Sequence, residues 1–479
     1  MSPSRRDFIR GACCAAAAFG TAASFERFSL LSALAQSPSN YKALVCIFLF
    51  GGNDSSNLVV PMADAGIPAG YRYSDYATIR GSLASGGLAL PQTGTGSLLP
   101  ITAANPQPGG VRDFGLHPSM PAVQGLFQQQ RVAVVANMGT LFTPLTRAQY
   151  VNPATPRPAN LFSHSDQQQQ WQTSRPDGFG ITGWAGRTAD YVHPLFNVGA
   201  QFPPITTVAG TAIFCTGSAT SPFALSPTTN PANIGLSVAS RGSAEANARL
   251  LSLQELLTFD TGVSLVQATS SITGAALQQS ASLSAALQGT PALATQFPTT
   301  SIGNQLAQVA RILKARPLLD ASLQRQVFFC SMGGFDTHTG QIADQANLLG
   351  QLDAAMSAFF TATQELGIVN DVTTFTLSEF GRALKPASGA GSDHGWGGHQ
   401  LVMGGAVIGG DIYGRMPYMV LGNATGSEDS STSGRWIPST SVDQFGATLA
   451  KWFGVPDANL NAIFPNLPNF TTRDLGFML

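Results

Sequence analysis

Aspartate and histidine side chains gather in two glycine-rich segments of this sequence. The segment GSDHGWGGHQ contains Asp393, His394 and His399. A second segment, FDTHTGQ, places His338 two residues after Asp336. Imidazole and carboxylate groups together suit Zn, Mn or Fe better than Ca or Mg, which prefer shells of oxygen ligands. The two segments therefore predict a metal site.

Two apolar runs end alike, FLFGGND at Asp54 and CSMGGFD at Asp336. Ligands of open α/β sheets bind in the crevice at the carboxyl ends of the strands, and two carboxylates brought there repel each other unless a cation lies between them. Together with the three histidines and two aspartates named above, Asp54 gives six ligands for two divalent ions, for which Zn or Mn are the first candidates. Each ion would keep a coordination position open for a substrate. Alternatively, both aspartates only close turns.

The sequence TLSEFGR adds Glu379 and Arg382 to the same crevice. Glu379 comes directly after a predicted strand, so we expect it to be a metal ligand or to orient one. The planar guanidinium of Arg382 suits an oxyanion substrate. A surface ion pair is the alternative for Arg382.

The sequence leaves the nucleophile open. Ser163, followed by Asp166 three residues later, matches a helix capping box, with a simple N-cap as the alternative. A hydroxyl at a helix N-terminus would also lie well for attack on an anionic ester. Ser163, His164 and Ser165 compete for this catalytic role, as do the two serines that follow Asp54. Attack by water would need none of them.

Four apolar runs predict strands buried on both faces, which are typical of a parallel sheet. These runs are residues 43–50, 131–139, 326–334 and 372–380. Apolar residues at three- and four-residue spacing predict helices after the third run and at 442–452. A strand, a helix and a strand form the right-handed crossover of a parallel sheet. We therefore expect an α/β fold with a mostly parallel central sheet flanked by helices.

The expected domain spans residues 36–479, with an insertion rich in Ala, Ser and Thr at about 200–300. Its segment 262–290 contains no charged residue and is either a helical cap or a lid. Lys and Arg number 25 and Asp and Glu 26, so the chain offers no basic surface for nucleic acid. We expect that this chain is not an integral membrane protein, because no apolar segment after the N-terminal one approaches membrane-spanning length.

The N-terminus predicts export. SRRDFIR carries a pair of arginines, the uncharged GACCAAAAFGTAAS follows, and ALAQ offers a cleavage site, so residues 1–35 read as a twin-arginine signal peptide. The protein would then be exported folded, to the periplasm or beyond the cell. Cys46, Cys215 and Cys330 remain after cleavage, an odd number in apolar or loop surroundings, so no disulfide framework is expected.

Together with these motifs, FLFGGNDSSNLVVP, SHSDQQ, GGFDTH, SEFGR and SDHGWGGHQLVMGG resemble a family of exported bacterial proteins. That family is grouped with the alkaline-phosphatase-like superfamily, which includes sulfatases and phosphodiesterases. The resemblance implies an alkaline-phosphatase-like fold over the whole mature chain. It also implies two metal sites, one held by Asp54, Asp393 and His394. The other would be held by Asp336, His338 and His399.

The sequence therefore predicts an exported metal-dependent hydrolase of phosphate or sulfate esters, with an anionic ester as substrate. Two alternatives stay open. One is a non-catalytic exported protein on the same fold that binds a partner or assists surface assembly, and the other is a metal-dependent amidohydrolase. The sequence does not determine the oligomeric state.

Overall fold

A computed structural model describes residues 40–227, 244–259 and 262–479. Residues Lys42–Leu479 form one compact unit. The predicted signal peptide, residues 1–35, lies outside the described residues.

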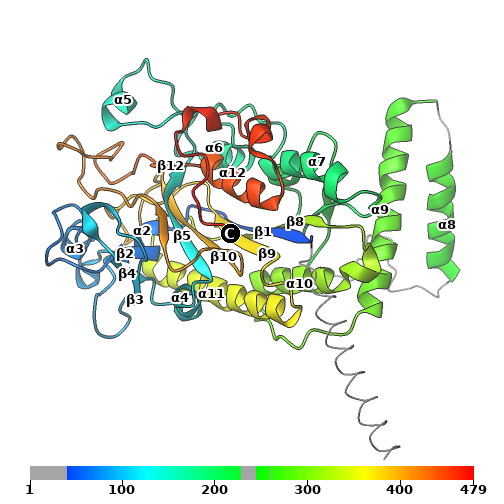
Figure 1. The fold of residues 1–479 in the computed structure, drawn as a ribbon, viewed down its shortest axis with the longest axis horizontal. Helices are drawn as coiled ribbons and strands as arrows, with labels where there is room; N and C mark the ends of the chain where they lie inside the picture. The colour runs from blue at the N-terminus through cyan, green and yellow to red at the C-terminus, as the bar shows by residue number, and fades with distance from the viewer. Residues whose placement is uncertain (1–39, 228–243, 260–261) are drawn as a thin grey trace, which may run out of the picture. The chain divides into compact units, whose positions relative to one another are not determined.

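Within the described residues, a nine-stranded sheet has β1 (Lys42–Leu49) between β8 (Arg325–Met332) and β9 (Val372–Leu377) (Figure 1). The strand order is β11-β5-β10-β9-β1-β8-β6-β7, and β12 pairs with β5. The other strands are β5 (Val132–Gly139), β6 (Ile205–Thr207), β7 (Phe223–Ala224), β10 (Gly398–Gly404), β11 (Ile412–Gly414) and β12 (Thr440–Ser441). A separate sheet contains β2 (Val59–Pro61), β4 (Asp113–Leu116) and β3 (Leu99–Thr102).

The predicted mostly parallel sheet is confirmed. The pairs that β1 forms with β8 and with β9 are parallel, whereas β10 runs antiparallel to both β5 and β9. All four strands predicted from apolar runs are present as β1, β5, β8 and β9. Strand β10 was missed, because its start lies in the glycine-rich segment that suggested a loop.

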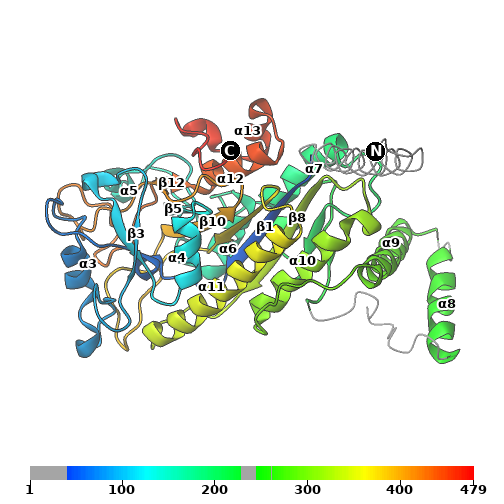
Figure 2. The same ribbon diagram turned by 60° about the horizontal axis from the view of Figure 1, so that its bottom comes forward.

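Helices cover both faces of the large sheet. Figure 2 shows α4, α10 and α11 on one face and α7, α12 and α13 on the other. Both predicted helices are confirmed, as α11 and α12. The helices are α2 (Ser55–Leu58), α3 (Tyr73–Arg80), α4 (Pro121–Gln128), α5 (Arg147–Val151), α6 (His164–Thr173), α7 (Trp184–Phe196), α8 (Ala244–Thr258), α9 (Ser264–Gly289), α10 (Ser301–Leu319), α11 (Gln341–Glu365), α12 (Val442–Phe453) and α13 (Leu460–Ile463).

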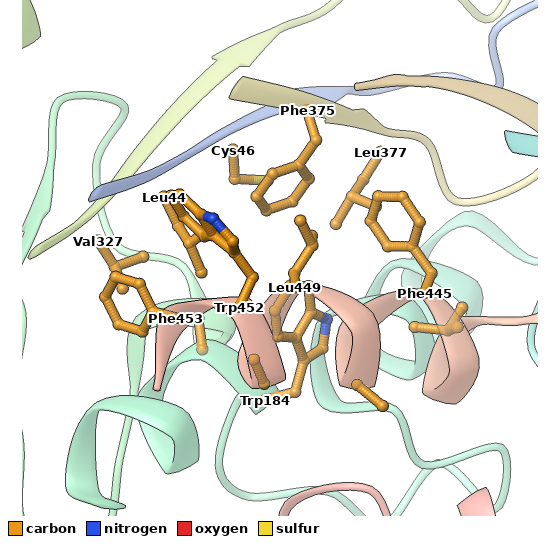
Figure 3. Packing of buried hydrophobic residues seen from close by; sticks show 14 of the residues in the cluster. Leu44, Cys46, Trp184, Val327, Phe375, Leu377, Phe445, Leu449, Trp452 and Phe453 are labelled. Atoms are coloured by element: carbon orange, nitrogen blue, oxygen red, sulfur yellow. The ribbon is translucent and has the colours of Figure 1, made fainter. Parts of the chain in front are cut away.

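One core cluster joins the central strands to α12. Leu44 and Cys46 of β1 point to this face because alternate side chains of a strand share a side. They meet Phe445, Leu449 and Trp452 of α12 (Figure 3). Burying each large apolar side chain contributes about 1.5–3 kcal/mol, so this packing fixes the sheet that carries the site.

The uncharged part of the insertion is helical. Segment 262–290 contains the whole of α9, and the buried residues Ser280, Leu283, Ser284 and Ala286 lie in the half that leads toward α10. Among the described residues, the cysteines Cys46, Cys215 and Cys330 are free and buried, as expected. No helix in the described part of the chain combines the length and apolar character needed to cross a membrane.

Candidate metal centre

Three neighbouring parallel strands deliver polar residues to one edge of the sheet. Strand β1 leads to Asp54, β8 leads to Asp336, and β9 leads to Glu379. The loops after β1 and β8 touch directly, because Phe335 donates its backbone N–H to Phe50. The predicted crevice at the carboxyl ends of the strands is therefore where the chemical groups gather.

Three imidazoles and one carboxylate converge there. The Nε2 atom of His394 lies 3.1 Å from Nε2 of His164 and 3.0 Å from Nε2 of His338. Asp336 Oδ1 lies 3.1 Å from Nε2 of His394 and 3.0 Å from Nε2 of His338. Its Oδ2 lies 3.3 Å from Nε2 of His164. His164, Asp336 and His394 offer ligand atoms within 4.8 Å of one another, a group that could hold a metal ion.

The outer nitrogens of two rings are already occupied. His394 Nδ1 lies 2.7 Å from the carbonyl oxygen of Phe162, and His164 Nδ1 lies 2.8 Å from Glu379 Oε1. A carbonyl and a carboxylate only accept hydrogen bonds, so each Nδ1 carries the hydrogen. In neutral rings the two Nε2 lone pairs then face each other at 3.1 Å. This arrangement fits a cation between them, with outer partners that orient the ligands.

Glu379 is fully buried and contacts the ring nitrogen of His164 that faces away from the cluster. Its Oε1 accepts hydrogen bonds from the backbone N–H of Gly51 (2.8 Å) and from Nε2 of Gln168 (3.1 Å), besides contacting His164. The hydrogen bond with Glu379 raises the pKa of His164, and the charge of Asp336 adds to this. Of the two roles expected for Glu379, the geometry supports orienting a ligand.

Arg382 lies behind Asp336 rather than facing a substrate. Its buried guanidinium donates to Asp336 Oδ1 (2.9 Å), to the Gly51 carbonyl (3.0 Å) and to the hydroxyl and carbonyl oxygens of Ser392. Burial alone would raise the pKa of Asp336, but the hydrogen bond and charge of Arg382 outweigh it and lower the pKa to about 2. The geometry assigns Arg382 to holding Asp336 ionised, because protein acceptors take every nitrogen of its guanidinium.

Asp54 does not join the cluster. Its buried carboxylate contacts the guanidinium of Arg80, and its Oδ2 accepts from Nε2 of Gln341 at 2.5 Å. Arg80 also donates to Asn57 (3.2 Å), so it is locked in place. A cation supplied by the protein therefore stands at Asp54, where the sequence led us to expect a metal.

The segment 391–400 separates its three candidate residues. His394 is in the cluster, whereas His399 lies in β10, buried, with Nδ1 accepting from the backbone N–H of Asn137 at 3.0 Å. Burial lowers the pKa of His399 to about 4. Asp393 stays at the exposed rim, 4.0 Å from His338 Nδ1 and 3.6 Å from Arg435.

Ser163 precedes α6 without capping it. Its side chain accepts no capping hydrogen bond from the backbone of α6, and its hydroxyl donates instead to Asp166 Oδ2 at 2.5 Å. Ser163 and Asp166 therefore interact, as predicted, but through a direct hydrogen bond between their side chains rather than through capping of the helix. Oγ of Ser165 lies 3.3 Å from Oγ of Ser163.

Several residues around the cluster carried no signal in the sequence. The Phe162 carbonyl contributes through its backbone, which no residue type reveals. Gln168, Gln341 and Arg435 are ordinary polar residues whose role comes from distant neighbours. His164 was assigned a catalytic role, and its ligand geometry follows only from the approach of α6 to the sheet.

The fold and this site define an α/β protein in which His164, Asp336 and His394 could hold a metal ion at the carboxyl edge of the sheet. The chain belongs to the family described as Protein of unknown function (DUF1501), which it matches over residues 41–433. No curated protein matches the chain. Among solved structures, it is similar to that of Ps i-CgsB in complex with k-i-k-neocarrahexaose, with a TM-score of 0.33 and 9% identity, covering 88% of this chain and 74% of that one.

Proposed function

We propose that this chain is an exported, metal-dependent hydrolase of phosphate or sulfate esters. The observation that carries the proposal is the convergence of three imidazole Nε2 atoms on Asp336, with the outer nitrogens of His164 and His394 held by acceptors. Asp336 and His338 are 44% and 48% exposed at the side chain, so solvent and a substrate can reach this side of the cluster.

His164, Asp336, His338 and His394 would hold one divalent ion, with Zn or Mn the first candidates. The sequence predicted two ions. The proposal takes one, because Asp54 is paired with Arg80 and His399 is buried in β10. In such a site the ion supplies Lewis-acid polarisation of an ester oxygen.

The chain's own groups prepare this site. Glu379 and the Phe162 carbonyl orient two imidazoles so that Nε2 faces inward. Arg382 keeps Asp336 ionised. Besides Arg382, Arg435 places a positive charge beside the exposed rim at Asp393. This charge favours an anionic substrate over a neutral one.

Ester hydrolysis also needs an attacking oxygen. Ser163 is one candidate, because its hydroxyl hydrogen already points to the Asp166 carboxylate, the group that would receive the proton. The hydrogen bonds from Asn160 and Ser163 lower the pKa of Asp166, so it is ionised at neutral pH. A water molecule is the other candidate.

The proposed location of the protein outside the cytoplasm follows from its N-terminal sequence. The arginine pair in SRRDFIR supports export by the twin-arginine pathway to the periplasm or beyond. Folded export would allow the metal to be loaded before the protein crosses the membrane.

The proposal is tested with the full chain purified after export. Metal content is measured by elemental analysis, and aryl phosphate, phosphodiester and aryl sulfate substrates are screened with and without chelator. We expect about one equivalent of metal per chain and hydrolysis that chelator abolishes. His164→Ala and Asp336→Asn should lose the ion and the activity, since each removes a ligand.

Two variants serve as controls. His193→Ala removes a histidine of α7 that lies outside the cluster and should keep both metal and activity. Asp54→Asn should keep the metal in the folded fraction. Loss of metal in Asp54→Asn, or a wild-type protein that hydrolyses none of the esters, would count against the proposal.

A further inference from the structure

The turn before α6 holds two residues in backbone conformations that side chains rarely adopt. Phe162 has a φ of 73° and Asn160 a φ of 46°. Asparagine tolerates this left-handed region, whereas a bulky phenylalanine there is a true outlier. Such strain persists only where surrounding contacts enforce it, and it gathers at functional sites.

The strained conformation aims a carbonyl at the cluster. The carbonyl oxygen of Phe162 lies 2.7 Å from Nδ1 of His394, the imidazole that is central in the cluster. Because a carbonyl cannot donate, this contact fixes the hydrogen on Nδ1 and leaves the Nε2 lone pair facing Asp336. A turn with relaxed dihedral angles at Phe162 would point that carbonyl elsewhere.

Arg435 holds the other side of Phe162. Its guanidinium carbon lies 4.6 Å from the centre of the Phe162 ring, and a terminal nitrogen lies 3.6 Å from Asp393 Oδ2. Arg435 therefore contacts both Phe162, whose carbonyl accepts from His394, and Asp393, which precedes His394 in the chain. A planar guanidinium stacks on an aromatic ring in a way that an aliphatic side chain cannot.

The backbone of Arg435 is itself anchored. The buried carboxylate of Asp429 accepts from the backbone N–H groups of Gly422, Ser431, Gly434 and Arg435, at 2.8–3.1 Å. The Arg435 carbonyl accepts from Ser430 at 2.9 Å. This loop is thus a fixed support from which the guanidinium reaches Phe162.

We propose that Arg435 is a positioning residue for the metal ligand His394. By holding the Phe162 ring it keeps the strained turn in place, and the turn's carbonyl sets the orientation of the imidazole and the position of its hydrogen. This inference rests on the metal site of the proposed function but not on the reaction that the site performs.

The test uses the full-length protein and two readouts. The first is zinc affinity, measured by competition with a chelator. Arg435→Met keeps the length of the side chain and removes the guanidinium, and we expect it to weaken zinc binding by about 10-fold or more, the range found when the outer partner of a ligand is lost. Phe162→Leu removes the ring by a second route and should weaken binding similarly.

The matched control is Arg157→Met. Arg157 also places its guanidinium over an aromatic ring, 5.4 Å from the centre of Tyr150, but the Tyr150 carbonyl accepts from Arg157 itself, whereas the Phe162 carbonyl lies at His394. Its zinc affinity should equal that of the wild type. Equal affinities of Arg435→Met and Arg157→Met would overturn the proposal.

The second readout separates this inference from the proposed function. In metal-free protein with ¹⁵N-labelled histidine, the nitrogen resonances of His394 report which ring nitrogen carries the hydrogen. We expect Nδ1 protonation in the wild type and a mixture of tautomers in Arg435→Met. An unchanged tautomer in Arg435→Met would refute the positioning role, whereas absence of zinc binding in the wild type would refute the metal site.

Discussion

The carboxylates that follow β1 and β8 are neutralised by different guanidinium groups. Asp54 meets Arg80 in the interior, and Asp336 meets Arg382 at the edge of the cluster. Gln341 and Ser392 connect the two pairs, because Gln341 donates to Asp54 and its Oε1 accepts from the Ser392 hydroxyl at 2.6 Å. Only Asp336 remains in contact with the imidazoles, so the same local pattern yields one structural and one candidate functional carboxylate.

Burial of His399 makes the stability of the fold depend on pH. His399 is buried and neutral, with its pKa lowered to about 4 by burial. Its folded pKa lies below the unfolded value, so its contribution to stability is present above pH 6.5 and is lost as the pH falls toward 4. That difference corresponds to about 3 kcal/mol. We expect His399→Gln, which retains an acceptor for Asn137, to flatten the stability–pH curve in this window.

Urea unfolding between pH 4 and 7 checks the expectation. The pKa of His117 is also lowered to about 4 by burial, and it contributes equally to both proteins. His193→Gln, in α7, provides the control. If the wild type and His399→Gln lose stability in parallel as the pH falls, His399 is not the group responsible.

At the scale of elements, the site depends on how closely two loops approach. Gly51 follows β1 with a φ of 118°, and a Cβ atom there would lie 2.3 Å from the backbone nitrogen of Asp336. Its carbonyl accepts from Arg382 and its N–H donates to Glu379. One glycine thus lets the ends of β1, β8 and β9 come together.

Gly51→Ala should therefore displace the loop that carries Asp336. We expect a loss of about 2 kcal/mol in stability, because the new methyl group meets backbone atoms that cannot move aside. Zinc affinity should fall as well. Gly66→Ala is the matched control, since Gly66 also has a positive φ of 76° but open space around its Cβ position. Equal losses in the two variants would show that the backbone angle, rather than the collision, is responsible.

At the scale of the whole molecule, the candidate ligands come from three distant parts of the chain. His164 begins α6, Asp336 and His338 follow β8, and His394 precedes β10. An ion that binds the folded chain but not the unfolded chain would link these segments. It would raise the free energy of unfolding by RT ln(1 + [L]/Kd), where [L] is the concentration of the free ion. Zinc at 100 times its Kd should add about 2.7 kcal/mol to the free energy of unfolding.

Chelator should remove this increment in urea unfolding experiments at neutral pH. His394→Ala should unfold at the same urea concentration with and without zinc, while His193→Ala should respond like the wild type. A wild-type protein whose unfolding is indifferent to zinc would contradict a site that joins these segments.

The four apolar runs were enough to predict the central strands and their burial on both faces. The runs that became β1, β5, β8 and β9 are apolar on both faces, which parallel strands covered by helices require. The sequence also indicated that acidic and imidazole groups gather at one edge of the sheet, because strand ends of a parallel sheet share that edge, but it grouped His394 with Asp54 and Asp393 rather than with Asp336 and His338. These properties depend on composition and spacing within short windows, which are visible in a linear chain.

Which polar groups join the cluster depends on how distant segments pack together. The partner of Asp54 comes from α3, the carbonyl at His394 comes from the turn before α6, and the guanidinium at Phe162 comes from the loop after β11. Each contact joins segments far apart in sequence through packing of the intervening core. A carbonyl oxygen or a guanidinium has no distinguishing pattern until the fold brings its partner within hydrogen-bonding distance.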